Sequence, residues 1–153
     1  MLIVGMVGWG ENLHPTQLTP YEQYTHISLW SMLSAPLLVG CDLSKLDAFT
    51  LNLLTNDEVI AIDQDPLGKQ GRLVVTKDSA QIWVKELEDG TKAVAIFNLT
   101  NDFKKTTVKW EEIGLKGSLN VRDVWRQKSL EVQKDEFGEL IPPHGVVLVK
   151  VSR

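Results

Sequence analysis

The chain has 153 residues, of which 43% are hydrophobic and 24% charged, and its formal net charge at pH 7 is −4. This composition is typical of a globular protein with one domain or two small ones. The acidic balance argues against nucleic acid or an anionic membrane as a partner, and no apolar run approaches the roughly 20 residues that span a bilayer. A single cysteine, Cys41, excludes an internal disulfide framework and a multi-cysteine zinc site.

The N-terminus is apolar but has neither a basic region nor a cleavage site, so we expect no signal peptide. So apolar a beginning is typical of the interior of a longer protein. Residues 1–5 are compatible with the end of a strand. Residues 6–18 contain several glycines and Pro15, which predicts a loop.

A helix is predicted over residues 19–34 by three agreeing signals at its start. Thr19 is suited to the N-cap, Pro20 to the first helical position, and Glu22 completes a capping box with Thr19. Apolar residues between Tyr21 and Leu33 occupy most of the circumference of this helix. We therefore expect more than one structural element to cover it.

Residues 35–43 (APLLVGCDL) form a short apolar run that predicts a strand buried on both faces, as in a parallel sheet. Two short helices are predicted at 47–54 and 56–62, with Asp47 and Asn56 as their caps. A helix that leads into a buried strand is a fragment of α/β architecture. The chain itself offers no set of parallel neighbours for that strand.

The pattern changes after a turn-rich connector at residues 63–71. Beyond it the sequence alternates with period two or is rich in β-branched residues, at 72–76, 81–87, 92–99, 106–110, 120–125 and 145–151. Short strands at such spacing predict an antiparallel, Greek-key-like β-sandwich. We place a domain boundary near residue 70, which gives domains of 1–70 and 71–153.

The nucleophilic and metal-binding residue types give weak signals. His14, His26 and His144 are far apart in sequence and form no ligand pair at helical spacing. His26 is more typical of a core position and His144 of a turn. Cys41 could in principle act as a nucleophile, but a small buried residue near a strand end is the simpler interpretation. The glycines at 5, 8 and 10 have the wrong order for a phosphate-binding loop.

Carboxylates are stronger candidates. Asp42 follows the predicted parallel strand, where α/β barrels place catalytic residues, and a polar loop cap is the alternative. Asp63 and Asp65 lie in the connector, where hydrogen bonds to the turn explain them. Asn98-Leu99-Thr100 matches the pattern for N-glycosylation, which occurs often by chance.

Several of these stretches, in their order along the chain, resemble the late-barrel region of family 27 glycoside hydrolases, and most closely the α-galactosidases. The motifs are Met1-Leu2, residues 22–30 (EQYTHISLW), 35–43 (APLLVGCDL) and 59–71 (VIAIDQDPLGKQG), with a looser match at 121–125 (VRDVW). The resemblance implies the last helix–strand–helix portion of a (β/α)8 barrel followed by an antiparallel β-sandwich. It also implies hydrolysis of terminal α-linked galactose, or a related sugar, with retention of configuration and without a cofactor or metal.

In that family the nucleophile and the acid/base are aspartates on earlier barrel strands, so the resemblance implies that no catalytic residue lies in this chain. Met1 alone maps to a sugar-contacting position, and the resemblance shifts Asp42 towards a structural role.

Family members are commonly exported or lysosomal. We expect the chain alone to be inactive, and we expect its barrel portion, residues 1–60, to be disordered or to form oligomers through exposed apolar surface while residues 72–153 fold. A non-catalytic carbohydrate-binding or interaction module, with Trp83, Trp110 and Trp125 as stacking platforms, is the alternative.

Overall fold

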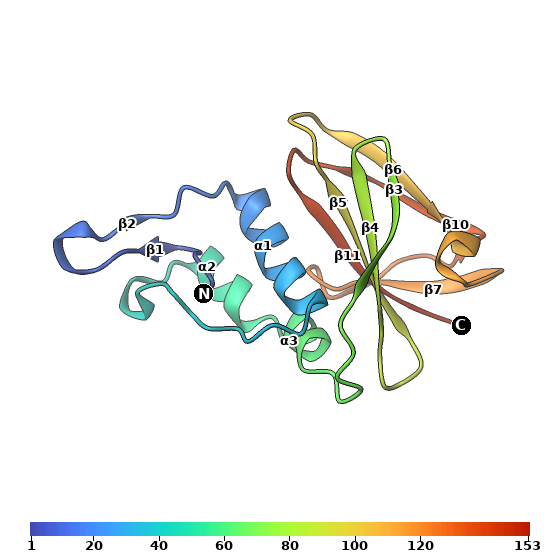
Figure 1. Ribbon diagram of the computed structural model, residues 1–153, viewed down its shortest axis with the longest axis horizontal. Coiled ribbons are helices and arrows are strands. Elements are labelled where there is room, and N and C mark those ends of the chain that lie inside the picture. Colours follow the sequence, from blue (N-terminus) through green and yellow to red (C-terminus); the bar gives the residue numbers. More distant parts are fainter.

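The computed structural model describes residues 1–153, and its shape is elongated, with helix α1 between a β-rich body and a narrower N-terminal part (Figure 1). We call residues 1–70 the N-terminal region and residues 71–153 the β-region. The N-terminal region contains β1 (Met6–Val7), η1 (Gly10–Asn12), β2 (His14–Pro15), α1 (Pro20–Met32), η2 (Leu43–Lys45), α2 (Ala48–Thr55) and α3 (Asp57–Asp63). The β-region contains β3 (Arg72–Lys77), β4 (Ala80–Glu86), β5 (Lys92–Asn98), β6 (Lys104–Lys109), η3 (Trp110–Ile113), β7 (Ser118–Asp123), β8 (Lys128–Ser129), β9 (Gln133–Lys134), β10 (Glu136–Ile141) and β11 (Val146–Ser152).

The predicted start of α1 is confirmed in detail. The Thr19 hydroxyl accepts a hydrogen bond from the backbone N–H of Glu22 at 3.3 Å, and the Glu22 carboxylate accepts one from the Thr19 backbone N–H at 2.8 Å. This reciprocal pair satisfies two N–H groups that the first turn of a helix leaves without partners. The short helices also begin where predicted, because Asp47 caps α2 and Asn56 caps α3 through their side-chain oxygens.

Two parts of the N-terminal region differ from the sequence prediction. The predicted loop at 6–18 contains a small antiparallel hairpin, in which Met6 faces Pro15. The buried strand predicted within residues 35–43 forms only isolated bridges: Leu2 pairs in parallel with Val39 and Val7 antiparallel with Cys41, and Leu38 is 62% exposed. An apolar strand becomes buried on both faces only when strands and helices surround it, and here only Leu2 and Val7 pair with it.

The β-region is antiparallel throughout, which confirms the predicted sandwich. The larger sheet has the order β3-β4-β5-β11-β7-β8, with β9 also paired to β7, and β6 and β10 form a second sheet. Strand β10 was missed by the sequence prediction. It pairs with β6 over its whole length, from Glu136 opposite Lys109 to Ile141 opposite Lys104.

Two hydrophobic clusters lie on opposite faces of the larger sheet, and strand β5 contributes to both. Ala93, Ala95 and Phe97 belong to the cluster that includes Ile27 and Met32 of α1, whereas Val94 and Ile96 belong to the cluster between the two sheets. The alternation follows from the two-residue period of a strand. One face of the sheet therefore carries the N-terminal region and the other carries the second sheet.

Candidate functional site

Met1, the residue that the family resemblance places in contact with sugar, lies beside the backbone of residue 40. Its side chain is 63% exposed, and its Cε would be 2.9 Å from a Cβ added at Gly40. Glycine is thus the residue that lets the two chain segments approach closely. The Leu2 N–H donates to the Leu38 carbonyl at 2.7 Å, and the Gly40 N–H donates to the Leu2 carbonyl at 2.9 Å. These bonds fix the main chain next to Met1 while its side chain stays open to solvent.

Asp42 is engaged in capping the short helix η2. One carboxylate oxygen accepts hydrogen bonds from the Ser44 backbone N–H at 2.9 Å and from the Ser44 hydroxyl at 2.7 Å. The same bonds hold the pKa of Asp42 below its ordinary value. A carboxylate that is already occupied in this way and kept ionised has the features of a structural cap.

Two of the three histidines meet at one cavity, of about 370 Å³, which Trp83 also lines. One ring nitrogen of each already has a partner: His26 Nε2 accepts from the Ile3 backbone N–H at 3.3 Å, and His144 Nε2 lies 2.7 Å from the Asn101 side-chain oxygen. Burial lowers the pKa of His26. No group of three or more histidine, cysteine, aspartate and glutamate side chains is close enough together to hold a metal ion.

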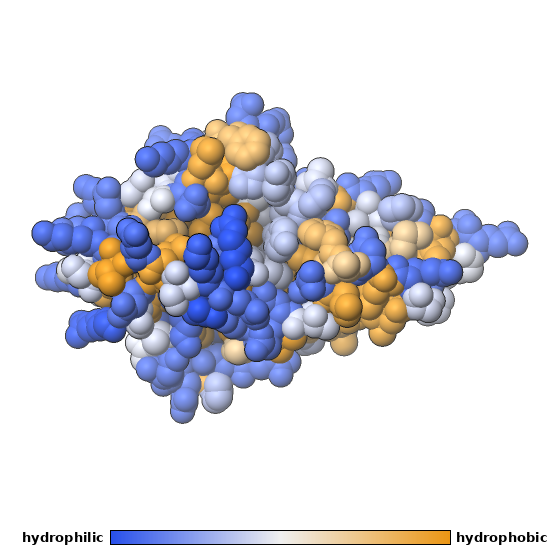
Figure 2. All heavy atoms as spheres, turned by 180° about the vertical axis from the view of Figure 1, so that it is seen from behind, coloured by the Kyte–Doolittle hydropathy of each residue, from blue (hydrophilic) through white to orange (hydrophobic).

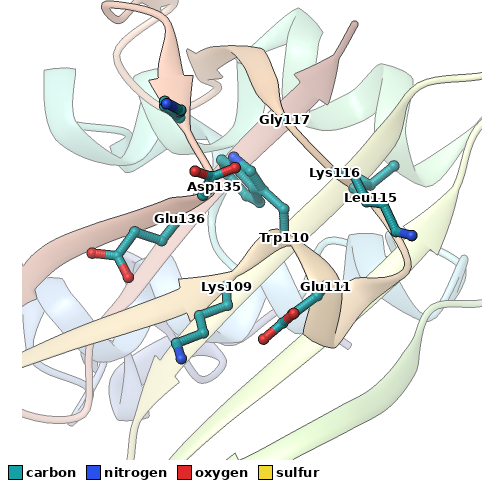
Figure 3. Close-up of a pocket in the computed structure, with 9 residues that line it drawn as sticks. Lys109, Trp110, Glu111, Leu115, Lys116, Gly117, Asp135 and Glu136 are labelled. Atoms are coloured by element: carbon teal, nitrogen blue, oxygen red, sulfur yellow. The ribbon is translucent and has the colours of Figure 1, made fainter.

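A second cavity, of about 590 Å³, is open on the β-region. Its lining residues are Lys109, Trp110, Glu111, Leu115, Lys116, Gly117, Lys134, Asp135 and Glu136. Figure 3 shows that its charged side chains come from separate segments of the β-region. They include no cluster that could hold a metal ion, and we assign no chemistry to this cavity.

The three tryptophans proposed as stacking platforms have different surroundings. Trp110 is fully buried, its ring stacks on Phe137 at a centroid distance of 6.4 Å, and its indole N–H donates to the Gln133 carbonyl. Although it lies at the wall of the 590 Å³ cavity, it has no exposed surface on which a ligand could stack. Trp83 and Trp125 are partly buried, and each lines a cavity.

Asn98 is not available for glycosylation in the folded chain. It is 1% exposed, and its side-chain amide donates to the carbonyls of Asp102, Ile141 and Pro142. A sugar on this nitrogen would remove those bonds and would need space that the fold fills. The amide holds together the end of β5 and the turn after β10.

Sequence reasoning missed the most unusual polar residue, Lys85 of β4, which is fully buried. Its ammonium donates to the Ser34 hydroxyl at 2.7 Å, to the Ser31 carbonyl at 3.1 Å and to the Ile62 carbonyl. These groups lie at the C-terminal ends of α1 and α3, where a helix presents unpaired carbonyls and partial negative charge. The sequence did hold one signal of this burial: Lys85 occupies an inward-facing position of the strand predicted at residues 81–87.

Asp63 lies close to this cation. Burial lowers the pKa of Lys85, against the opposing charge of Asp63, and burial raises the pKa of Asp63, against the opposing charge of Lys85. One carboxylate oxygen of Asp63 is buried without a hydrogen-bond partner. Lys85 thus connects the β-region to both helices, and its contacts are with the main chain of α1 and α3 and with Ser34.

The class of protein follows from matches to two family profiles in consecutive positions. Residues 1–65 match the family described as alpha galactosidase A, and residues 77–151 match the alpha galactosidase C-terminal beta sandwich domain. Together these profiles cover both regions in the expected order. The predicted resemblance to α-galactosidases is confirmed.

Individual relatives agree with the profiles. The chain is 42% identical over 137 residues to a probable alpha-galactosidase of Dictyostelium discoideum, and the aligned part covers 86% of this chain and 36% of the relative. It is 36% identical over 138 residues to alpha-galactosidase 2 of Arabidopsis thaliana, over 89% of this chain and 35% of the relative. The crystal structure of a family 27 β-L-arabinopyranosidase from Geobacillus stearothermophilus matches with a TM-score of 0.92 and 30% identity, over 99% of this chain and 36% of that one.

The chain therefore matches the C-terminal part of an α-galactosidase-like glycoside hydrolase of family 27. It spans about a third of the length of the relatives named here. No helix in the structure combines the length and the apolar character that crossing a membrane requires.

Proposed function

We propose that this chain forms the C-terminal part of a retaining glycoside hydrolase that removes terminal α-linked galactose or a related sugar. The observation that carries the proposal is the pair of consecutive family matches over residues 1–65 and 77–151, together with the likeness to a family 27 crystal structure over 99% of the chain. One solved relative is named for arabinopyranose rather than galactose, so we include related sugars in the substrate class.

Retention of configuration requires two carboxylates about 5 Å apart, one as the nucleophile and one as the acid/base. The resemblance implies that both lie on earlier barrel strands. The role of this chain in the reaction is then to supply the last part of the barrel and the β-region beside it. Met1 contributes a thioether at the edge of the sugar pocket, and the domain boundary lies near residue 70.

The test compares two polypeptides on a chromogenic α-galactoside. A longer protein that carries this chain after a complete set of barrel strands is expected to hydrolyse the substrate. The chain of 153 residues is expected to give no turnover above buffer. Robust hydrolysis by the shorter chain would refute the assignment of the catalytic pair, and failure of the longer, correctly folded protein on α-galactosides and related glycosides would refute the activity.

The exposed apolar surface of the N-terminal region supports a second expectation, that this chain self-associates when it is produced alone. Met1, Trp9 and Leu38 are each more than half exposed, and Figure 2 shows apolar residues gathered over the narrower end of the molecule. Contiguous apolar surface of this kind marks association sites. Sedimentation is expected to show species larger than the 17.2 kDa monomer, and a monomer at high concentration would contradict the expectation.

A further inference from the structure

A small cavity of about 180 Å³ lies where α1 meets the β-region. Its walls come from three places: the first turns of α1 with Tyr21 and Tyr24, the turn after β7 with Trp125 and Arg126, and the strands β10 and β11. The cavity therefore exists only while the two regions are packed together. It is separate from Met1, the residue that the proposed hydrolytic activity places near sugar.

Contacts with neighbouring side chains fix the rings of Tyr24 and Trp125, which we call the aromatic wall of this cavity. The Tyr24 and Trp125 rings meet edge to face at a centroid distance of 4.7 Å, and Tyr24 makes a second such contact with Phe49 of α2 at 5.6 Å. The Trp125 indole N–H donates to the Ser28 hydroxyl at 2.8 Å. Rings fixed in this way lose little freedom when a ligand binds, which favours affinity.

Polar groups with unused hydrogen-bonding capacity surround the aromatic wall. Three polar groups at the cavity make no hydrogen bond or ion pair within the chain: the hydroxyls of Tyr21 and Tyr24 and the carboxylate of Glu139. None of these groups is among the buried polar atoms that lack a partner. Arg126 Nη1 donates to an Asp123 oxygen at 2.5 Å, and the side chain is 74% exposed. The rest of its N–H fork remains open to a ligand.

We propose that this cavity binds one neutral pyranose residue as a non-catalytic sugar site. A pyranose presents an apolar C–H face and a rim of hydroxyls that both donate and accept. The wall of rigid aromatic rings suits the face, and the free donors of Arg126 together with the free acceptor of Glu139 suit the rim. The volume corresponds to about six water molecules at ~30 Å³ each, which accommodates a single ring.

The charges around the cavity favour a neutral ligand over a charged one. Arg126 is already paired with Asp123, which also lines the cavity, so an anion would meet two carboxylates. Glu139 is exposed to solvent, which screens its charge and leaves a cation only a weak attraction. The hydroxyl groups of a sugar can hydrogen-bond to both Arg126 and Glu139. The proposal concerns binding alone, so it does not depend on the hydrolytic activity, and the two can fail separately.

The test is a titration of the whole ¹⁵N-labelled chain with methyl α-D-galactopyranoside at millimolar concentrations, observed by NMR. We expect saturable shifts of the Trp125 indole N–H and of backbone amides in the first turns of α1 and in β10. Sorbitol, an acyclic polyol with similar hydroxyl groups and no ring face, serves as the control ligand. Absence of saturable shifts, shifts that map elsewhere, or equal shifts with sorbitol would overturn the proposal.

Two matched variants sharpen the result. Glu139→Gln removes the charged acceptor at the cavity, and we expect about tenfold weaker binding, because a hydrogen bond to a charged acceptor is stronger than one to a neutral acceptor. Glu136→Gln makes the same change on the same strand outside the cavity and should bind as the parent does. Equal affinities for the two variants would place the ligand elsewhere. Both residues are exposed on their strand, so neither change is expected to unfold the chain.

Discussion

The N-terminal region and the β-region differ in how completely they bury their apolar side chains. In the β-region, two antiparallel sheets enclose a cluster that includes Val94, Ile96 and Val108, all fully buried. In the N-terminal region, Trp9 is 87% exposed and Leu38 is 62% exposed. Because hydrophobic burial is the main force that stabilises a fold, we infer that the first region completes its core only within a larger structure. An apolar sequence thus indicates where a core is needed, and the partners decide whether one forms.

The strongest way to break this arrangement is Lys85→Met, which removes the cation that joins the two regions. Carbonyls at the ends of α1 and α3 would lose their donor. We expect a loss of about 3–5 kcal/mol in the free energy of unfolding, as when one partner is removed from a buried charge network. Chemical denaturation measures the loss, and hydrogen exchange should show α1 and α3 losing protection before β5 does.

Lys69→Met is the control for that change. Lys69 forms an ion pair with Glu86 at 2.9 Å on the surface, with its side chain 60% exposed. Its replacement should alter the stability by no more than about 0.5 kcal/mol. A similar effect of the two substitutions would mean that Lys85 does not join the regions.

Asn98→Ala should weaken the β-region alone. The substitution leaves the carbonyls of Ile141 and Pro142 without their donor in a buried setting. We expect a loss of about 1–3 kcal/mol, with faster amide exchange in β5 and β10. Asn120→Ala, at an exposed position near the C-terminus, is the matched control and should have little effect. Unchanged stability in Asn98→Ala would show that the buried amide is dispensable.

Thr19→Ala should affect the N-terminal region alone. It removes the hydroxyl that accepts the Glu22 N–H, and loss of such a cap costs about 1 kcal/mol. We expect the first turn of α1 to exchange its amide protons faster while the β-strands keep their protection. Thr19→Ser retains the hydroxyl and should restore the parent behaviour. Equal exchange in the two variants would contradict a role for the cap.

The smallest effects are expected from changes of pH, and the two regions should lose stability in different pH ranges. Burial lowers the pKa of His26 below its ordinary 6.5, so the unfolded chain binds this proton more readily. The stability that His26 contributes is present above pH 6.5 and is lost as the pH falls from there through its folded pKa. Below pH 6.5, we expect the denaturation midpoint of the parent to fall more steeply than that of His26→Gln. The same pH dependence in both proteins would contradict the assignment.

In the β-region, Asp89 titrates at lower pH. Hydrogen bonds from Lys150 and Thr91 lower its pKa from 3.8 to about 2, so its contribution is present above 3.8 and is lost as the pH falls through about 2. Its carboxylate is half exposed, so the effect is small. Acid should therefore loosen the N-terminal region first. A reversed order in pH-dependent hydrogen exchange would break the comparison.

Local patterns made most elements predictable. The cap at Thr19 predicted the start of α1, and the β-branched residues around Val94 and Ile96 predicted a strand, which the structure buries on both faces. Strand β10 escaped notice because Gly138 and two glutamates interrupt its apolar residues. That glycine is required by its neighbour: a Cβ there would lie 2.5 Å from the Thr107 hydroxyl, a contact between strands that the sequence does not reveal.

The sites were less predictable than the elements, because they depend on contacts between distant residues. The resemblance indicated Met1 and the absence of a catalytic pair, and the structural role favoured for Asp42 agrees with its cap on η2. Nothing local indicated that Tyr24 and Trp125, about a hundred positions apart, would form one wall. The same holds for Lys85, whose partners come from the ends of two helices.

The position of α1 bears on how the chain folds as it is synthesised. The Thr25 hydroxyl donates to the His144 carbonyl, 119 positions later, and Trp125 reaches Ser28 across 97 positions. Contacts so distant in sequence form late, because a long loop must close first. The helix emerges from the ribosome early and stays without its docking surface until the final strand, β11, has followed. During that interval its apolar side chains are exposed to aggregation, which chaperones counteract.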